Sequence, residues 1–277
     1  MTGQTVWLAS YPKSGNTWLR AVYSAWLTGE PPDLNELDGS LIASARHLFD
    51  DALGIPSSDL TPDEIEVLRP RADEVRARDA TGPLLRKVHD AFFTGPAGEP
   101  VLSVAATRSA VYVIRDPRDV AVSLAHHDGK SVEQAAGQLA NPKANAGGLH
   151  GFAGQVRQRL GTWSEHVRSW TDHAPFPVHV LRYEDCLTDP VPAFETALRA
   201  AGLEPVDHGR VAAAVELADF HRLRAAEARD GFRERSPASD RFFRSGRAGS
   251  WREEMSADVA ASISEAHADQ MKRFGYA

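Results

Sequence analysis

A short connector near the N-terminus, "YPKSGNTW" at residues 11–18, carries groups that could bind an anion. Lys13 supplies a mobile positive charge, and Gly15 lets the backbone come close to a ligand. Three short polar donors complete the connector: Ser14, Asn16 and Thr17. If the connector joins a strand to a helix, its backbone N–H groups and the helix dipole form a site for a phosphate-like anion.

The connector differs from the Walker A loop of nucleotide kinases. Its lysine precedes the glycine, and the Gly-Lys-[Ser/Thr] ending is absent. The simplest alternative is a surface turn followed by a helix cap. A second alternative is a nucleotide kinase, because "VYVIRD" at 111–116 is similar to a Walker B strand. Magnesium-ATP would then lack its usual lysine and hydroxyl partners.

Four apolar, β-favouring runs are predicted as strands, at 5–10, 83–89, 110–116 and 178–185. Helices are predicted between and after them. The first follows the stripe Leu19, Val22, Tyr23 and Trp26, and another begins at Thr61-Pro62 and continues to about 78. Further helices are predicted from Pro117 to about His127, from 152 to 170, and near 191–201, 207–217 and 256–273.

The long helix at 152–170 is predicted from its apolar spacing, which places Trp163 and Trp170 in the core. Small and polar residues predict loops at 137–151 and 228–250. Alternating strands and helices indicate a three-layer α/β/α arrangement with a central parallel sheet. We expect one domain over residues 1–277, since no change of composition marks a boundary.

Composition narrows the function further. The net charge of −7 disfavours a nucleic-acid binder, which usually carries a basic face. The single cysteine, Cys186, excludes an internal disulfide and favours a reducing cytoplasm. We expect no signal peptide and no membrane helix, since no run approaches the roughly 18 apolar residues required.

Several segments, in order along nearly the whole chain, resemble the sulfotransferases that use 3′-phosphoadenosine-5′-phosphosulfate, PAPS. "YPKSGNTW" is similar to their 5′-phosphosulfate loop, and "KVHD" at 87–90 to their catalytic segment. "VIRDPRDVAVSLAHH" at 113–127 is similar to their 3′-phosphate segment. "GTWSEHVRSW" at 161–170 and "VLRYEDC" at 180–186 also match, as does "FFRSGRAGSW" at 242–251. The resemblance implies a P-loop nucleoside-triphosphate-hydrolase-like fold.

The resemblance implies a 3′-phosphate site at Arg115 and Ser123, completed by the C-terminal motif residues Arg244, Ser245 and Gly246. Ser245 stands where the family has lysine, and Arg247 lies close enough in sequence to compensate. The alternative for Arg115 is a salt bridge with Asp116 or Asp119, and for Ser123 an ordinary helix serine. Arg118 is interpreted as a surface charge.

The resemblance also implies an adenine site formed by Tyr183 and Phe220, and Trp18 follows the phosphate loop closely enough to reach the base. Core packing is the alternative for each aromatic ring. For catalysis it implies His89 as the general base, whose unperturbed pKa of ~6.5 suits proton removal near neutral pH. Lys13 and Lys87 would neutralise the charge that grows on the leaving oxygen and the sulfonate. Lys87 and His89 are two residues apart, so a strand would project both from one face.

The sequence therefore predicts a PAPS-dependent sulfotransferase that acts on a hydroxyl of a small molecule and requires no metal. His126 and His127 diverge on a helix, which disfavours a metal pair, and the resemblance instead implies a place near the acceptor pocket. That pocket would draw on residues 30–80, the helix end near His127, and the segment 137–151. The alternatives are a nucleotide kinase and a non-catalytic nucleotide-binding module. A homodimer is left open.

Overall fold

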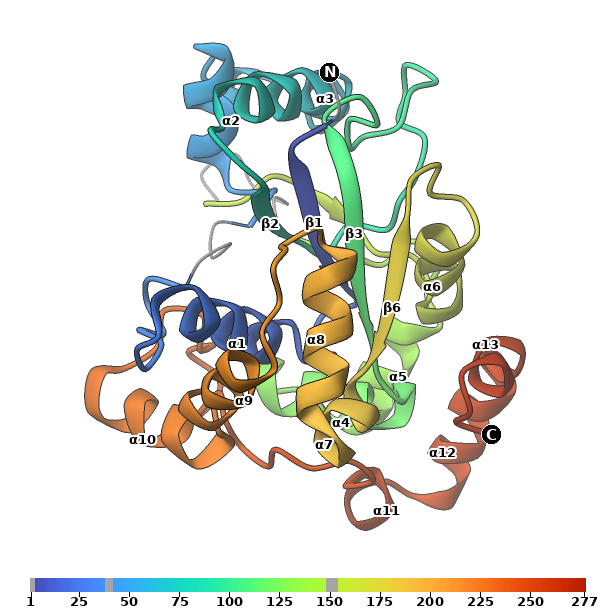
Figure 1. Cartoon of the computed structure of the whole chain (residues 1–277). Coiled ribbons are helices and arrows are strands. Elements are labelled where there is room, and N and C mark those ends of the chain that lie inside the picture. The colour runs from blue at the N-terminus through green and yellow to red at the C-terminus, as the bar shows by residue number, and fades with distance from the viewer. Residues whose placement is uncertain (1–2, 38–41, 148–153) are drawn as a thin grey trace.

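The computed structural model describes residues 3–37, 42–147 and 154–277. A sheet of four parallel strands lies at its centre, in the order β2–β1–β3–β6 (Figure 1). The strands are β1 (Thr5–Ser10), β2 (Leu84–Val88), β3 (Thr107–Ile114) and β6 (Val178–Arg182). All four predicted strands are confirmed, although the fourth ends at Arg182, where helix α7 (Tyr183–Thr188) begins.

The strand sequences read as continuous apolar runs because helices cover both faces of the sheet. Along β1, Val6 and Leu8 face one core, while Trp7 and Ala9 face the other. The first core is closed by α1 (Asn16–Thr28), α8 (Pro190–Ala200) and α9 (His208–Leu217). The second is closed mainly by α4 (Pro117–Asp128), α5 (Val132–Leu139) and α6 (Trp163–Thr171). The predicted three-layer α/β/α arrangement is confirmed (Figure 1).

Helices α2 (Arg46–Leu53) and α3 (Pro62–Asp79) lie next to each other beside the sheet, joined by the short helix η1 (Ser57–Asp59) (Figure 1). The predicted start of α3 at Thr61-Pro62 is confirmed, and Thr61 forms a capping box with Glu64. Arg69 of α3 forms a buried ion pair with Asp90, just beyond β2, with a distance of 2.8 Å. This pair ties α3 to the end of the strand that carries Lys87.

The predicted long helix at 152–170 is wrong. Within residues 154–170, the part of this range that the structure describes, only α6 is helical. It is preceded by the short strand β5 (Gln158–Arg159), which pairs with β4 (Asn145–Ala146). Val156 and Leu160 are buried as their spacing suggested, but from an extended segment. The helix begins only after Thr162, which caps it. Phe152 lies outside the described residues, as do residues 148–151 of the loop predicted at 137–151. The described part of that predicted loop includes the end of α5 and the short strand β4.

The C-terminal third adds α10 (Phe220–Asp230), which was not predicted, and α11 (Trp251–Glu254). The predicted helix at 256–273 consists of two, α12 (Ala257–Ala266) and α13 (Ala268–Arg273), separated at His267. The loop between α10 and α11, residues 231–250, crosses the sheet near its carboxyl edge and contacts Lys87 of β2 and Arg115, which follows β3. No helix among the described residues is long and apolar enough to span a membrane.

Candidate active site

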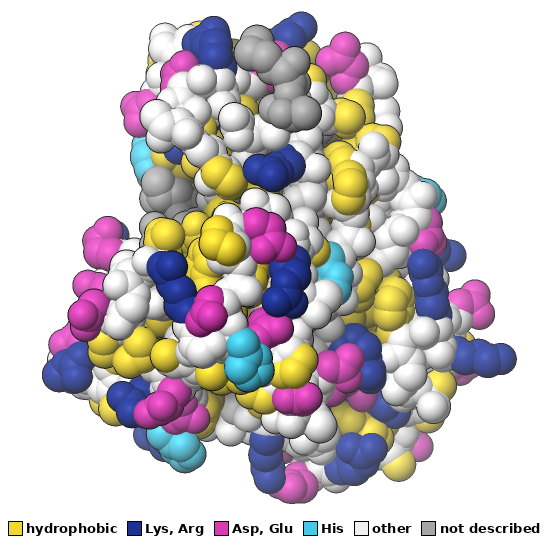
Figure 2. Space-filling model, viewed as in Figure 1, with side chains coloured by type: hydrophobic (Ala, Val, Ile, Leu, Met, Phe, Trp, Pro, Cys, Tyr) yellow, Lys and Arg dark blue, Asp and Glu magenta, His cyan; other side chains and the backbone are white. Residues whose placement is uncertain are grey.

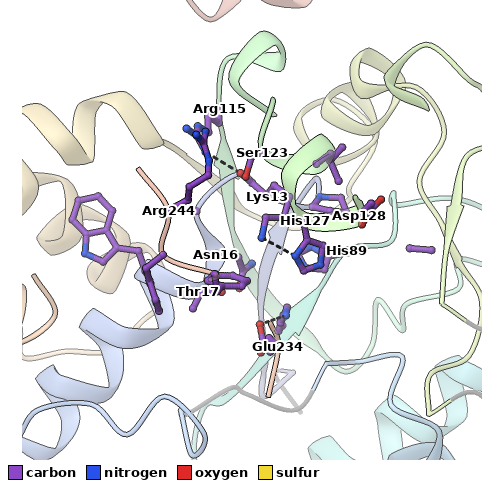
Figure 3. Close-up of a pocket in the computed structure, with 18 of the residues that line it drawn as sticks. Lys13, Asn16, Thr17, His89, Arg115, Ser123, His127, Asp128, Glu234 and Arg244 are labelled. Carbon is purple, nitrogen blue, oxygen red and sulfur yellow. Dashed lines mark hydrogen bonds and ion pairs between the residues drawn. The ribbon is translucent and has the colours of Figure 1, made fainter. Parts of the chain in front are cut away.

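A cavity of about 670 Å³ opens at the carboxyl edge of the sheet, where ligands of open α/β folds bind (Figure 3). Each of the four strands is followed by one of its lining residues. These are Lys13 after β1, His89 after β2, Arg115 after β3 and Tyr183 after β6. Apart from Ser14, every predicted site residue lines the cavity: Lys13, Gly15, Asn16, Thr17, Trp18, Lys87, His89, Arg115, Ser123, Tyr183, Phe220, Arg244, Ser245 and Gly246.

The loop after β1 has the strained geometry of a ligand-binding turn. Lys13 has φ 69°, a left-handed conformation that is costly for a residue with a Cβ. Gly15 has φ 110° and lies against the Tyr183 ring, so that a Cβ there would come within 2.6 Å of it. Asn16 anchors the loop by donating a hydrogen bond from Nδ2 to the Leu8 carbonyl, 2.8 Å away. The N-cap residue Gly15 has no side chain to cap α1, so the first N–H groups of this helix can receive an anion.

Arg115 is held in place by carbonyl groups and a ring, with no acidic partner among the described residues. Its guanidinium donates to the carbonyls of Lys13, at 3.2 Å, and Arg247, at 3.1 Å, and lies 4.4 Å from the centre of the Tyr183 ring. The alternative of a salt bridge with Asp116 or Asp119 is therefore not observed, and no carboxylate among the described residues competes with a ligand for the guanidinium.

The two aspartates are used elsewhere. Asp119 accepts hydrogen bonds from the backbone N–H groups of Gly249 and Trp251, which holds the C-terminal motif beside α4. Asp116 forms a two-bond ion pair with Arg118. The interpretation of Arg118 as a surface charge was wrong, because this side chain also donates to the Tyr276 carbonyl and stacks on Trp251.

The C-terminal motif supplies a second cluster beside Arg115. Arg244 reaches the cavity while forming an ion pair with Glu254 at 2.9 Å. Ser245 has a buried hydroxyl with no hydrogen-bond partner among the described residues. Arg247 does not take the place of the absent lysine, because its side chain points to Glu253, at 2.5 Å, and does not line the cavity.

Aromatic rings form the wall near α10. Gly246 has φ 65°, and a Cβ there would overlap the Phe220 ring, so the ring packs directly on the backbone of the C-terminal motif. Trp18 donates from Nε1 to the Ala218 carbonyl at 3.1 Å and packs edge-on against Tyr183. Trp18 and Phe220 thus pack against the first core and also line the cavity, which Tyr183 lines as well. A flat ring could stack in this part of the cavity.

The ring of His89 is fixed by its surroundings. Its Nδ1 lies 2.8 Å from the Ser10 carbonyl, and because a carbonyl can only accept, Nδ1 carries the proton. The lone pair of Nε2 is therefore the basic position. Burial, reinforced by the charge of Lys87, lowers the pKa of His89 to about 3. The imidazole is neutral at neutral pH, which is the form that can accept a proton.

His166 of α6 contacts the backbone of His89. Its Nε2 donates to the His89 carbonyl at 3.0 Å, and its Nδ1 accepts from the Tyr112 hydroxyl at 2.9 Å. Burial lowers the pKa of His166 to about 4. This residue was not singled out from the sequence, and it acts on the position of the His89 backbone without lining the cavity.

Glu234 is the main residue that sequence reasoning missed. It comes from the loop at 231–250 and lies at the cavity (Figure 3). Its carboxylate forms ion pairs of 2.8 Å with both Lys87 and Arg20. Burial alone would raise the pKa of Glu234, but the two cations lower it to about 2. The pairing with Lys87 spans 147 positions in the sequence, and no local pattern announces it.

Two lysines, Lys13 and Lys87, line the same cavity. Burial, followed by the charges of Lys87 and Arg115, lowers the pKa of Lys13 to about 7, against an opposing effect of Glu234. The Lys13 ammonium lies 3.8 Å from the centre of the Phe242 ring and 3.4 Å from Nδ1 of His127 (Figure 3). Burial also lowers the pKa of Lys87. Positive charge is therefore crowded here, and an anion would relieve it.

His126 and His127 do diverge, as predicted. His127 lines the cavity, whereas His126 points to Glu254, 2.6 Å away, and is exposed. Among the described residues no group of three or more His, Cys, Asp or Glu could hold a metal ion. The expectation that no metal is required remains a prediction.

Buried donors without partners in the described part of the chain indicate what the cavity can hold. They include the hydroxyl of Ser245 and the Nε of Arg115, two residues that line the cavity. Such groups are costly unless a ligand satisfies them. On the face drawn in Figure 2 acidic and basic side chains are intermixed. The donors of the cavity, together with Lys13 and Arg115, thus form a local site for an anion.

Comparison with known proteins agrees with this geometry. A family model described as "Sulfotransferase domain" matches residues 4–275. Cytosolic sulfotransferase 16 of Arabidopsis thaliana is 26% identical over 271 residues, covering 92% of this chain and 72% of that protein. Cytosolic sulfotransferase 17 of the same plant is 25% identical, covering 97% and 75%.

Solved structures show the same fold. Retinol dehydratase in complex with androsterone and the inactive cofactor PAP aligns with a TM-score of 0.60 at 20% identity, covering 98% of this chain and 82% of that chain. A mouse sulfotransferase complexed with PAP also aligns with a TM-score of 0.60, at 18% identity, covering 97% and 84%.

Proposed function

Because the chain belongs to the family of sulfotransferase domains, we propose that it transfers the sulfonate of PAPS to a hydroxyl of a small molecule. The S–O bond to the phosphate breaks, a new S–O bond forms to the acceptor oxygen, and the hydroxyl proton is released. The products are a sulfate ester and adenosine 3′,5′-bisphosphate, PAP. The solved relatives that hold PAP support this choice of donor.

We assign the phosphates to two groups of donors. The loop from Lys13 to Thr17 and the start of α1 bind the 5′-phosphosulfate. Arg115 and Ser123, with Arg244, Ser245 and Gly246, bind the 3′-phosphate. The unpartnered hydroxyl of Ser245 supports this, since it can donate to a phosphate where the family has a lysine. Tyr183, Phe220 and Trp18 provide the surface for adenine.

PAPS, when bound, supplies an activated sulfonate with a phosphate as its leaving group. His89 removes the acceptor proton through Nε2, because Nδ1 is already engaged with the Ser10 carbonyl. Lys13 and Lys87 stabilise the negative charge that develops on the transferred group and on the leaving oxygen. Glu234 holds the Lys87 ammonium near this position through its 2.8 Å contact, and Arg20 holds Glu234.

One observation carries the proposal. Lys13, His89 and Arg115 come from three different strand ends and meet in one cavity, although the sequence separates them widely. A surface turn would not require the left-handed Lys13 or the Gly15 backbone packed under Tyr183. The names of the plant relatives support a cytoplasmic location as part of the same proposal.

The test compares donors. Purified protein is incubated with PAPS or with magnesium-ATP and a panel of phenols, alcohols, sugars and amines, and nucleotide products are separated by chromatography. We expect PAP with PAPS only, at a rate that a magnesium chelator leaves unchanged. Phosphate transfer from ATP that is lost on chelation would instead identify a kinase. Binding of PAPS without release of PAP in any mixture would favour a non-catalytic module.

A further inference from the structure

The acceptor end of the cavity is lined by polar side chains, and this suggests a class of substrate. We propose that the acceptor is a polyhydroxylated molecule, a sugar or a glycoside, and that Gln158 is a specificity-determining residue that binds one of its hydroxyls. This inference rests on the proposed sulfotransferase function and narrows it.

Gln158 lines the cavity with an amide group that is almost fully buried. Its side chain is 2% exposed, and its Nε2 donates to Oε1 of Gln155 at 2.8 Å. The Oε1 atom of Gln158 is buried without a partner among the described residues. A buried amide oxygen without a donor is costly, and a substrate hydroxyl would satisfy it.

The backbone holds this amide pair beside the proposed catalytic residues. The Arg159 carbonyl accepts from the N–H of Ala91, two residues beyond His89, at 2.8 Å. On the other side, Val156 donates to the Ser44 carbonyl at 2.7 Å, and Ala43 donates to the carbonyl of Lys87, also at 2.7 Å. The chain that carries Gln155 and Gln158 is thus attached on both sides to the segment that contains Lys87 and His89.

A second polar cluster comes from the ends of α4 and α5. The Lys130 ammonium donates to Asp128 at 2.9 Å and to Oε1 of Gln138 at 3.2 Å, and all three side chains line the cavity. Asp128 directly follows His127 at the end of α4, and the His127 ring contacts the Lys13 ammonium. Hydrogen-bonding groups therefore approach the acceptor from two separate elements.

The two ends of the cavity differ in the kind of side chain that lines them. The end assigned to the donor has the aromatic wall formed by Trp18, Phe220 and Tyr183. Among the described residues, the lining near these polar groups also includes the apolar residues Ile42, Leu124, Ala146 and Leu160, so polar and apolar groups alternate at this end. A flat apolar acceptor would leave the Gln158 amide oxygen without a partner, whereas a sugar presents a hydroxyl to it and a C–H face to Ile42.

The experiment uses two acceptors that share a phenyl ring and an alcohol. Phenyl β-glucoside offers several hydroxyls, and 2-phenylethanol offers one. PAP release is measured with each at saturating PAPS. We expect kcat/KM for the glucoside to exceed that for 2-phenylethanol by about 100-fold or more. Gln158→Leu should lower the value for the glucoside by about tenfold, with that for 2-phenylethanol and the PAPS affinity unchanged.

Gln270→Leu is the matched control. Gln270 is also buried with an Oε1 that lacks a partner among the described residues, but it lies on α13 and does not line the cavity. This variant should retain the wild-type preference.

A wild-type preference for 2-phenylethanol would overturn the sugar assignment, and so would an equal loss for both acceptors in Gln158→Leu. In either case, release of PAP would still support sulfonate transfer. If neither acceptor reacts, saturation-transfer NMR with PAP present decides: glucoside contact in wild type but not in Gln158→Leu supports the site, and no contact contradicts it. Absence of PAPS binding would contradict the proposed function itself.

Discussion

Replacement of His89 by asparagine tests the assignment of the general base. The asparagine side chain is similar in size and can still donate toward the Ser10 carbonyl, which accepts from Nδ1 in the wild type at 2.8 Å. It has no basic nitrogen in the position of Nε2. Loss of a positioned base costs about 10²–10⁴-fold in rate, which corresponds to about 3–5 kcal/mol in the barrier. We expect at least the lower value in kcat, with the affinity for PAPS retained.

The pH dependence of the wild type sharpens this prediction. Because the pKa of His89 is lowered to about 3, the base is already neutral between pH 5.5 and 8. Protonation of His89 in the free enzyme should therefore reduce kcat/KM only at a pH far below its ordinary pKa of ~6.5. Bound PAPS brings negative charge that favours the protonated ring, so the acid limb of kcat should lie at higher pH than that of kcat/KM.

The assay is initial-rate PAP release from pH 5 to 8, beside calorimetric titration with PAPS. His208→Asn serves as the control, because His208 is exposed on α9 and pairs with Glu195 outside the cavity. A rate for His89→Asn within a few-fold of wild type across this range would show that His89 is structural. Proton removal would then belong to another group or to solvent.

Three further changes test other parts of the site and the fold. Arg115→Ala should erase most of the preference for PAPS over the same donor without the 3′-phosphate, a loss of about 1.5–3 kcal/mol measured by competitive binding; unchanged discrimination would place the 3′-phosphate elsewhere. Gly246→Ala should lower the free energy of unfolding by about 1–3 kcal/mol and weaken PAPS binding, because its Cβ would overlap Phe220. Gly29→Ala, with a similar φ of 77° and no described atom within 4 Å of the added Cβ, isolates the backbone cost, and equal losses in both variants would argue against the ring contact. His166 is neutral in the fold with its pKa lowered to about 4, so the unfolded chain binds the extra proton as the pH falls below ~6.5. The free energy of unfolding should therefore decrease from pH 7 to pH 5 by about 2 kcal/mol from this group, measured by urea denaturation, and the decrease should be smaller in His166→Asn.

The sheet and most helices were predictable because their signals are local. Continuous apolar runs mark the buried parallel strands, and Thr61-Pro62 marks the start of α3. The prediction of a helix at 152–170 was wrong because the spacing of apolar residues indicates which residues are buried, and not the backbone conformation. Val156 and Leu160 are buried from an extended chain that pairs with β4 and with Ser44, contacts that local sequence does not encode.

Some residues of the candidate site could likewise be predicted from the sequence, and others could not. Lys13 could be predicted from the residue types of its own loop, and His89 and Arg115 from the resemblance to the sulfotransferases. The parallel strands bring all three to one edge of the sheet. Glu234 could not, since its role depends on a loop that returns across the sheet to reach Lys87. Arg118 was misread for a related reason: its partners include the Tyr276 carbonyl near the C-terminus, 158 positions away.

The most direct test of PAPS binding by the loop after β1 is the proton uptake that accompanies it. With its pKa lowered to about 7, Lys13 is mostly neutral at pH 8, and the phosphosulfate should restore its charge. Calorimetric titration of PAPS at pH 8 in two buffers of different ionisation enthalpy measures this uptake. We predict close to one proton per PAPS for the wild type, and weaker binding with little uptake for Lys13→Ala. Equal affinity and equal proton uptake in the two proteins would contradict the assignment of this loop as the sulfonate donor site.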